Sequence, residues 1–492
     1  MSVVVTSVVT GPNVMPGLAV AYGMSKEAAF EAVEAEREQL VETALELWEN
    51  PELGLAEYES AALLQDALTE AGFEVETGVA GIETAFVARY GEGDPTIGLL
   101  EEFDALPDLS QRVATEREPV EAGAPGHGCG HNLFGVGSLG AAVGIKRAVE
   151  RGDVSGTVVY FGTPAEEILV GKPFMIRAGA FDDVDAVLSW HPGWYTGASV
   201  GSCLAMNSLQ FAFEGEASHA GSAPEAGRSA LDAVQLMNVG VEFTREHVPD
   251  EARIHYAVEN AGAAPNVVDP EASVWYYVRA PDRETVEEMT DWVRDVARGA
   301  ALMTRTDVDV DFRAGTYEVL ANHTLADVID ENMQTLGGFD VSEDDEAFAR
   351  ELKETLGDVS DQIGTLPEEY RSTARRRGLL TEPVPPFDED VVGTYSTDSG
   401  SVSQVVPVGR CRAATWPVGT PAHSWQAVAA SGSVGVNAAV FVAKALAGSA
   451  YDLMADPDLV AAAREEFETA TADRDYQDTI PEDGDPYETV DH

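Results

Sequence analysis

Four short segments of the sequence present side chains that bind metal ions or act in acid–base chemistry. Each one ends a predicted buried strand or opens a loop: GHGCGHN at 126–132, TPAEE at 163–167, SWHPG at 189–193 and GTPAHSWQ at 419–426. Glycine allows the backbone to turn tightly and to approach a bound ion. A Cys-x-His pair with no second cysteine nearby indicates either a metal ligand or a nucleophilic cysteine. Chemistry at strand ends is therefore the first expectation.

Taken one at a time, the last three segments have ordinary explanations. Adjacent Glu166 and Glu167 are costly at the end of a buried strand unless they are paired or bound to metal, but glutamate is also common in the first turn of a helix. His191 follows an apolar strand and could be a hydrogen-bonded core residue, and His423 is equally weak in isolation. The prediction of a metal site therefore depends on all four segments taken together.

Together the segments supply five metal ligands: Cys129, His131, Glu167, His191 and His423. Such a set suits two divalent ions that share a bridging group. Glu166 is not needed as a ligand, so it is the natural general base for an attacking water. Thiolate and imidazole favour Zn, and the carboxylate is compatible with Mn. We therefore expect one or two divalent ions per chain, Mn or Zn.

A metal-independent cysteine hydrolase is a competing interpretation of the same residues. Cys129 and His131 are close enough in sequence to contact each other and to form a nucleophile–base pair. That interpretation leaves Glu167, His191 and His423 without a role, so we favour the metal site.

Strands and helices alternate in the segments that must position these residues. Apolar runs such as TIGLL, GTVVYFG and AVLSW are typical of buried strands, and an amphipathic pattern predicts a helix over 25–49 with Ser25 as its N-cap. The alternation predicts an α/β fold with a parallel sheet.

The middle of the chain follows a different pattern, in the order β-α-β-β-α-β of a ferredoxin-like unit. We expect this unit to be an inserted domain at 207–322, within a catalytic domain formed by 25–206 and 323–492. Residues 1–24 are expected to be a disordered extension, and the acidic stretch 340–391 an irregular surface excursion.

The charge balance of the chain is extreme. It has 86 acidic and 30 basic residues, a net charge of −56, and only five of the basic residues are lysine. Such a surface repels nucleic-acid phosphates and anionic lipids, so neither is an expected partner. Concentrated salt screens self-repulsion, so acidic excess with lysine depletion predicts a halophilic source rather than an ordinary acidic cytosolic protein.

Three further features bear on the cellular location. Three cysteines are too few and too scattered to predict a disulfide framework. We expect no apolar run to be long enough to cross a membrane. A signal peptide would require a basic residue near the N-terminus, and none precedes Met24. We therefore expect a cytoplasmic protein.

The motifs GLLEEFDALPDLSQ, GHGCGHN, FGTPAEE, SWHPG and PAHSWQ resemble the metallopeptidase and amidohydrolase family that contains aminoacylase, carboxypeptidase G and the indole-acetyl-amino-acid hydrolases. The resemblance covers nearly the whole chain from about residue 25. It implies a metal-binding α/β domain with an inserted dimerisation domain, and hence a homodimer, with a separate partner subunit as the alternative. By motif position it implies the five ligands named above and Glu166 as the general base.

The same resemblance implies roles for four more residues. Asp104 matches an aspartate that supports the ligands from behind, although EEFDALP lacks the histidine ligand found in the carboxypeptidase branch. His219 matches a histidine of the inserted domain that polarises the scissile carbonyl, often in the partner subunit's site. Asn266 and Arg279 match polar residues that can hold a substrate carboxylate.

The expected function is hydrolysis of an amide bond next to a free carboxylate, in an N-acyl amino acid such as an aroyl-glutamate. A metallopeptidase acting on small dipeptides is the alternative with the same chemistry. A non-catalytic binding protein on the same fold is the alternative of another class. We disfavour the last because a degenerate copy would lose metal ligands first, and this chain retains all five.

Overall fold

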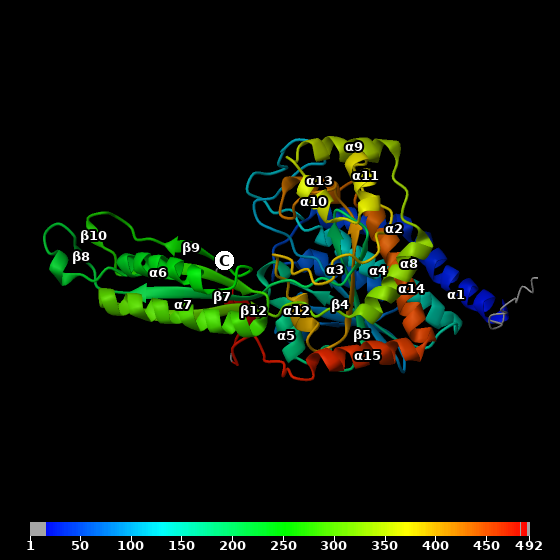
Figure 1. Cartoon of the computed structure of the whole chain (residues 1–492), viewed down its shortest axis with the longest axis horizontal. Helices are drawn as coiled ribbons and strands as arrows, with labels where there is room; N and C mark the ends of the chain where they lie inside the picture. Colours follow the sequence, from blue (N-terminus) through cyan, green and yellow to red (C-terminus); the bar gives the residue numbers. More distant parts are fainter. Residues whose placement is uncertain (1–15, 483, 490–492) are drawn as a thin grey trace, which may run out of the picture.

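The computed structural model describes residues 16–482 and 484–489, which form two lobes (Figure 1). The small lobe spans 205–316, and the large lobe contains the segments on both sides of it. Residues 1–15 of the expected N-terminal extension lie outside the described part of the chain.

The large lobe is built on a seven-stranded sheet in the order β1-β2-β4-β3-β5-β13-β6. The four central strands are parallel, as the alternation of strands and helices predicted, but both edges are antiparallel. Only a short connection, 78–85, joins β1 to β2, and a link of that length pairs strands antiparallel. The strands are β1 Glu74–Thr77, β2 Phe86–Glu92, β3 Thr96–Glu102, β4 Gly156–Thr163, β5 Ala186–Gly193, β6 Gly197–Ser199 and β13 Val408–Ala414.

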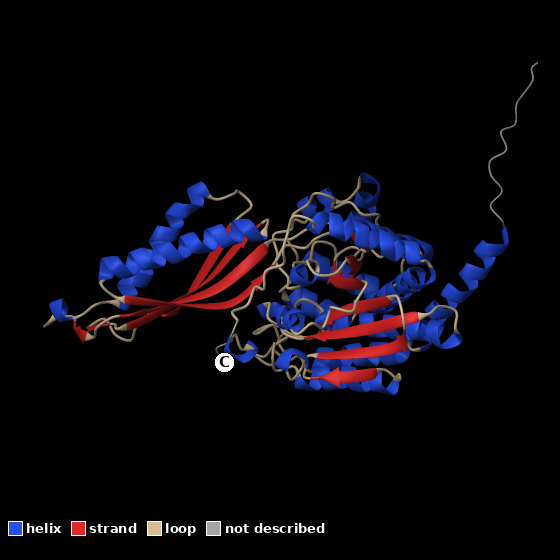
Figure 2. Ribbon diagram, turned by 90° about the horizontal axis from the view of Figure 1, so that it is seen from below, coloured by secondary structure: helices blue, strands red, loops and turns tan. Residues whose placement is uncertain are grey.

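Helices cover both faces of this sheet (Figure 2), which explains why its strands are apolar without alternation. On β4, Val158 and Tyr160 face one apolar core, and Val159 and Phe161 face the other. The first core is closed by α1 Pro16–Ala35, α2 Arg37–Glu49, α3 Tyr58–Glu70, α4 His131–Arg151, α8 His323–Leu336, α14 Val436–Ala455 and α15 Pro457–Thr471. The second is closed by α5 Gly171–Arg177 and α12 Ser399–Val402.

Helices α4 and α14 pack closely, because a side chain at Gly140 would meet the Ala443 methyl at 2.8 Å. The expectation that no run is long and apolar enough to cross a membrane is wrong for α14. This helix passes that test by length and composition, but 83% of its most apolar window is buried inside the protein. Its apolar surface is therefore part of the core of the large lobe.

Two helix predictions need correction. The helix predicted over 25–49 begins at Pro16 instead of Ser25, and it is interrupted at Glu36 before α2 continues. Proline suits a first helical turn, where its missing N–H is not needed. The stretch 340–391 is not irregular throughout, because it contains α9 Glu343–Glu354, α10 Ser360–Thr365 and α11 Glu368–Arg376. Ser342 caps α9, whose Ala349 and Leu352 are buried beside α13 Trp425–Ser431.

The small lobe is a four-stranded antiparallel sheet in the order β12-β7-β11-β9. Two helices cover one face of it, and no helix covers the other face within the described chain (Figure 2). Its elements are β7 Ala205–Glu214, α6 Ala230–Thr244, β9 Arg253–Asn260, β11 Glu271–Ala280, α7 Arg283–Thr304 and β12 Asp307–Thr316. A short antiparallel pair of strands, β8 Ser218–His219 and β10 Val267–Val268, forms the tip farthest from the large lobe (Figure 1).

Candidate active site

The carboxyl ends of the parallel strands meet at the edge of the large sheet that faces the small lobe, where α/β proteins place their ligands. Cys129 and His131 lie at the start of α4, where Gly130 takes a left-handed φ of 75°. The two glutamates follow β4, and His423 precedes α13. His191 lies within β5 rather than after it. The structure thus brings together all five expected ligands and Glu166.

The donor atoms of these residues form two groups that share one sulfur. Cys129, His131 and His191 place one donor atom each within 4.8 Å of one another, and so do Cys129, Glu167 and His423. A third group joins Glu102 to His131 and Glu166. Cys129 therefore belongs to both of the first two groups of candidate donors.

Several buried polar atoms among the candidate ligands have no hydrogen-bond partner, and such atoms indicate whether the ligands fit a cation. The Nδ1 of His131 lies 2.9 Å from Asp104 Oδ1, which accepts, so a neutral His131 ring carries its proton on Nδ1 and its lone pair on Nε2. That Nε2 faces Glu102 Oε2 at 3.1 Å, and neither atom has a hydrogen-bond partner in the described structure. Glu167 Oε1 is equally unpartnered. Facing acceptors of this kind fit a bound cation, so the residues present suit divalent metal.

Two buried carboxylates hold the glutamate loop. Asp104 Oδ2 accepts the Glu167 N–H at 2.9 Å, and Glu57 Oε1 accepts the Ala165 N–H at 2.8 Å. These bonds fix a backbone in which Ala165 has a left-handed φ of 58°. Asp104 therefore touches both His131 and the Glu167 backbone. Sequence reasoning missed Glu57, whose only signal is a carboxylate just ahead of α3.

Neighbouring charges and burial shift the pKa values of Cys129 and of the general-base candidate Glu166. Although burial opposes the thiolate, neighbouring His131 and His423 lower the pKa of Cys129 to about 6. Burial, with Glu102 and Glu167 nearby, raises the pKa of the Glu166 carboxyl well above its usual range. A carboxylate that binds a proton readily is suited to accept one from water.

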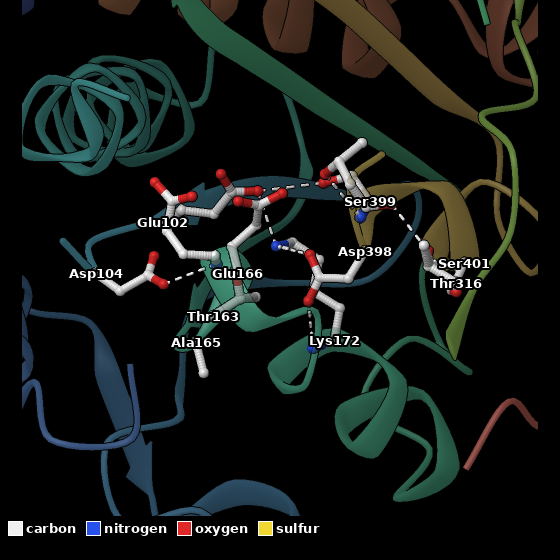
Figure 3. A network of polar contacts seen from close by, with 12 residues as sticks. Glu102, Asp104, Thr163, Ala165, Glu166, Lys172, Thr316, Asp398, Ser399 and Ser401 are labelled. Carbon is white, nitrogen blue, oxygen red and sulfur yellow. Dashed lines mark hydrogen bonds and ion pairs between the residues drawn. The ribbon is translucent and has the colours of Figure 1, made fainter. Parts of the chain in front are cut away.

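A buried ion network lies behind Glu166 (Figure 3). Lys172 Nζ is 2.5 Å from Asp398 Oδ1 and 2.8 Å from Glu102 Oε1, and all three side chains are inaccessible to solvent. Ser399 donates a hydrogen bond to Glu102 Oε1 at 3.3 Å. Lys172 and Asp398 were not expected as site residues, because each is a single charged residue in an otherwise ordinary segment.

Some histidines of the sequence motifs lie elsewhere. His127, in the same glycine-rich loop as Cys129, contacts the Leu47 carbonyl of α2 at 3.1 Å. His219 and Asn266 lie together at the far tip of the small lobe, where the Asn266 carbonyl accepts the Ala220 N–H. Neither of these two lines the cavity of its own chain.

The two lobes together line one cavity of about 280 Å³ over the candidate ligands. Arg279, the fourth residue expected from the resemblance, reaches this cavity from β11, together with Tyr277. The large lobe contributes Arg410, Arg412 and Tyr395, none of which was expected. The volume of this cavity is just below the range of about 300–1,000 Å³ that is typical of small-molecule sites.

The sequence comparison agrees with the class of protein that the fold and the site indicate. The profile of peptidase family M20/M25/M40 matches residues 99–370, and this chain belongs to that family. It is a metal-dependent hydrolase that acts on amide bonds.

Individual relatives narrow the comparison. The chain is 37% identical to one of the subunits of p-aminobenzoyl-glutamate hydrolase from Escherichia coli (strain K12), over 92% of this chain and 96% of that protein. It is 30% identical to the Xaa-Arg dipeptidase of Mus musculus, over 90% of this chain and 92% of that protein. A solved dinuclear metal-binding peptidase from Bacillus subtilis shares the fold, with a TM-score of 0.57 at 18% identity, covering 86% of this chain and 99% of that one.

Proposed function

We propose that this chain hydrolyses an amide bond next to a free carboxylate, in an N-acyl amino acid such as an aroyl-glutamate. The observation that carries the proposal is the presence of Glu166 and Arg279 in one cavity, a proton acceptor from one lobe and a carboxylate anchor from the other. The name of the Escherichia coli relative supports the same substrate class.

In this proposal Cys129, His131, Glu167, His191 and His423 would hold one or two divalent ions, Zn or Mn. Bound divalent ions would polarise the scissile carbonyl and make the attacking water more acidic. Glu166 accepts the proton of that water and returns it to the leaving nitrogen, so it acts first as base and then as acid. Asp104 keeps the His131 lone pair directed into the site.

The experiment that tests this function compares p-aminobenzoyl-glutamate with its C-terminal α-carboxamide. We expect the free acid to be hydrolysed at least about 100-fold faster, since the amide removes a charge-assisted contact to Arg279. Chelation should abolish the reaction. Equal rates for acid and carboxamide would contradict the proposal.

Dipeptide hydrolysis is a second candidate, supported by the name of the mouse relative. A dipeptide has a free α-amino group where an aroyl-glutamate has an aromatic ring. The rates for p-aminobenzoyl-glutamate and for an alanyl-glutamate dipeptide therefore decide between the two functions.

We further propose that the small lobe is a ferredoxin-like dimerisation domain. Its helix α6 exposes Leu236, Val239 and Phe243 at helical spacing, with 39%, 55% and 74% of each residue accessible. The edge strand β9 exposes Tyr256 and Val258. A second copy packed on this face would cover the patch and could bring His219 and Asn266 of one chain toward the cavity of the other.

The remaining expectations concern assembly and cellular setting. The Escherichia coli relative is named as a subunit, which keeps a heteromeric partner as an alternative to the homodimer. We place the enzyme in the cytoplasm of a halophile, on the net charge of −56 and the lysine depletion.

A further inference from the structure

The cavity contains three arginines without an acidic partner. Arg279, Arg410 and Arg412 all line it, and none forms an ion pair with aspartate or glutamate among residues 16–482 and 484–489. This is unexpected in a chain with 86 acidic and 30 basic residues, where a carboxylate is available for almost any cation. Apart from the arginines, the titratable groups of the lining are four candidate ligands, the general-base candidate Glu166, Glu102, Cys411 and the tyrosines.

Arg412 lies beside the candidate ligands. On β13 it stands in register with His191 of β5, and it shares a strand face with Arg410 two residues earlier. Its Nη2 donates to the Tyr395 hydroxyl at 3.0 Å, and its guanidinium carbon lies 5.4 Å from the centre of that ring. One neutral partner thus orients the group, and most of its five N–H donors remain for a ligand.

Asp388 is close enough to act on Arg412 electrostatically, but its oxygens bind other groups. Asp388 accepts the Ser199 hydroxyl at 2.5 Å on one oxygen and the Val200 N–H at 2.9 Å on the other. A half-buried guanidinium next to a cation site is unfavourable unless an anion lies between or beside them. The structure therefore leaves a place for an anionic group at Arg412.

Arg279, on the small lobe, offers a second binding place for an anionic group. Its Nε is buried without a hydrogen-bond partner, and its guanidinium carbon lies 5.4 Å from the Tyr277 ring centre. Arginine forks suit carboxylates because they bind both oxygens at once. Two forks from two lobes fit a ligand with two carboxylates.

We propose that Arg412 is a specificity-determining residue that binds the side-chain carboxylate of the substrate, so that the enzyme prefers N-acyl derivatives of acidic amino acids. The inference rests on the proposed function, in which Arg279 holds the carboxylate next to the scissile amide. A substrate with a cationic side chain, such as an N-acyl-arginine, would instead be repelled by Arg412 and Arg410.

The test compares N-benzoyl-glutamate with N-benzoyl-glutamine, which differ only in the charge of the side chain. In metal-loaded wild type, kcat/KM should be about 10- to 100-fold higher for the glutamate substrate, the range for a charge-assisted contact. Arg412→Met should remove this preference by lowering kcat/KM for glutamate and leaving that for glutamine within about threefold. Arg412→Lys, which keeps charge without the fork, should retain part of it.

Two further variants separate the role of Arg412 from that of Arg279 and from a general effect of charge. Arg279→Met should lower kcat/KM for both substrates alike, because both carry the carboxylate next to the amide. Arg147→Met removes the same charge from the exposed face of α4, where Arg147 pairs with Glu150, and should leave the preference unchanged. Metal content and melting temperature of each variant identify a loss of metal or of folding.

Three outcomes would overturn the inference. They are a wild type that does not distinguish the two substrates, an Arg412→Met variant that loses both activities equally with metal intact, and a preference that survives Arg412→Met. Failure of the proposed function looks different, because neither benzoyl substrate would then be hydrolysed by any form of the enzyme.

Discussion

Lys172 and Asp398 form an ion pair of 2.5 Å with no solvent access to either side chain, and Glu102 joins it at 2.8 Å. One ammonium thus pairs with two carboxylates and balances the charge of one of them, at the point where Glu102 faces His131. Through Lys172 of α5, this network connects the strand end that carries Glu102 to the loop ahead of α12.

Lys172→Met is expected to destabilise the fold by about 3–5 kcal/mol, because it leaves two buried carboxylates without a cation. Denaturant unfolding of the metal-free protein in constant salt measures the loss. Arg147→Met is the matched control, since it breaks an exposed pair with Glu150 and should cost less than about 1 kcal/mol. Similar costs for the two variants would show that the buried pair is not structural.

The Cys129 thiol gives a pH dependence that can be measured directly. In metal-free protein, iodoacetamide should alkylate Cys129 with a midpoint near pH 6, because His131 and His423 stabilise the thiolate against the effect of burial. The rate should therefore be high above that pH and fall as the pH drops below it. Burial raises the pKa of Cys203 and Cys411, so these thiols should stay unreactive. Peptide mass spectrometry separates the three sites, and a midpoint near the roughly 8.5 of an ordinary thiol would contradict the assignment.

Mixing two inactive variants tests whether His219 acts in the partner subunit. Glu166→Gln and His219→Ala should each be inactive as homodimers. Co-expressed, they should recover roughly a quarter of wild-type activity, since half of the dimers are mixed and each mixed dimer has one intact site. A mixture that stays as inactive as its parents, although mixed dimers are detected, would place His219 outside the reaction.

The net charge of −56 predicts that salt stabilises the protein. The melting temperature should rise steadily from dilute buffer to molar KCl as self-repulsion is screened. Equal ionic strength from NaCl should act similarly, because screening does not depend on the cation. A melting temperature unchanged over this range would count against halophilic adaptation.

The sequence predicted the site better than the surroundings of the site. Cys129, His131 and the Glu166–Glu167 pair sit in short segments whose glycine, proline and strand-end position are visible in the sequence, so their convergence was predictable. Arg412 and Lys172 were not, because a lone charge in an apolar stretch does not reveal whether it finds a partner across the fold. That partner depends on which strands become neighbours, as β13 and β5 do.

Contacts between distant parts of the chain also explain the other features that the sequence did not predict. Helix α14 has the length and composition of a membrane span, and only its packing against α4 and the sheet shows that it belongs to the core. Helices α9 to α11 were hidden by the acidic character of 340–391, since their buried stripes are narrow. The pairing of β8 with β10, which places His219 at the tip of the small lobe, was not predicted from the sequence either, because these strands lie about fifty residues apart in the chain.

The central claim is that Glu166 transfers protons while its neighbour Glu167 binds metal. The most direct measurement is metal content together with turnover of p-aminobenzoyl-glutamate, for Glu166→Gln and Glu167→Gln side by side. Glu166→Gln should keep its metal and lose at least about 10²–10⁴-fold in kcat, while Glu167→Gln should lose metal and activity together. Loss of metal from Glu166→Gln with retention by Glu167→Gln would reverse the two roles, and full activity in both variants would contradict the account.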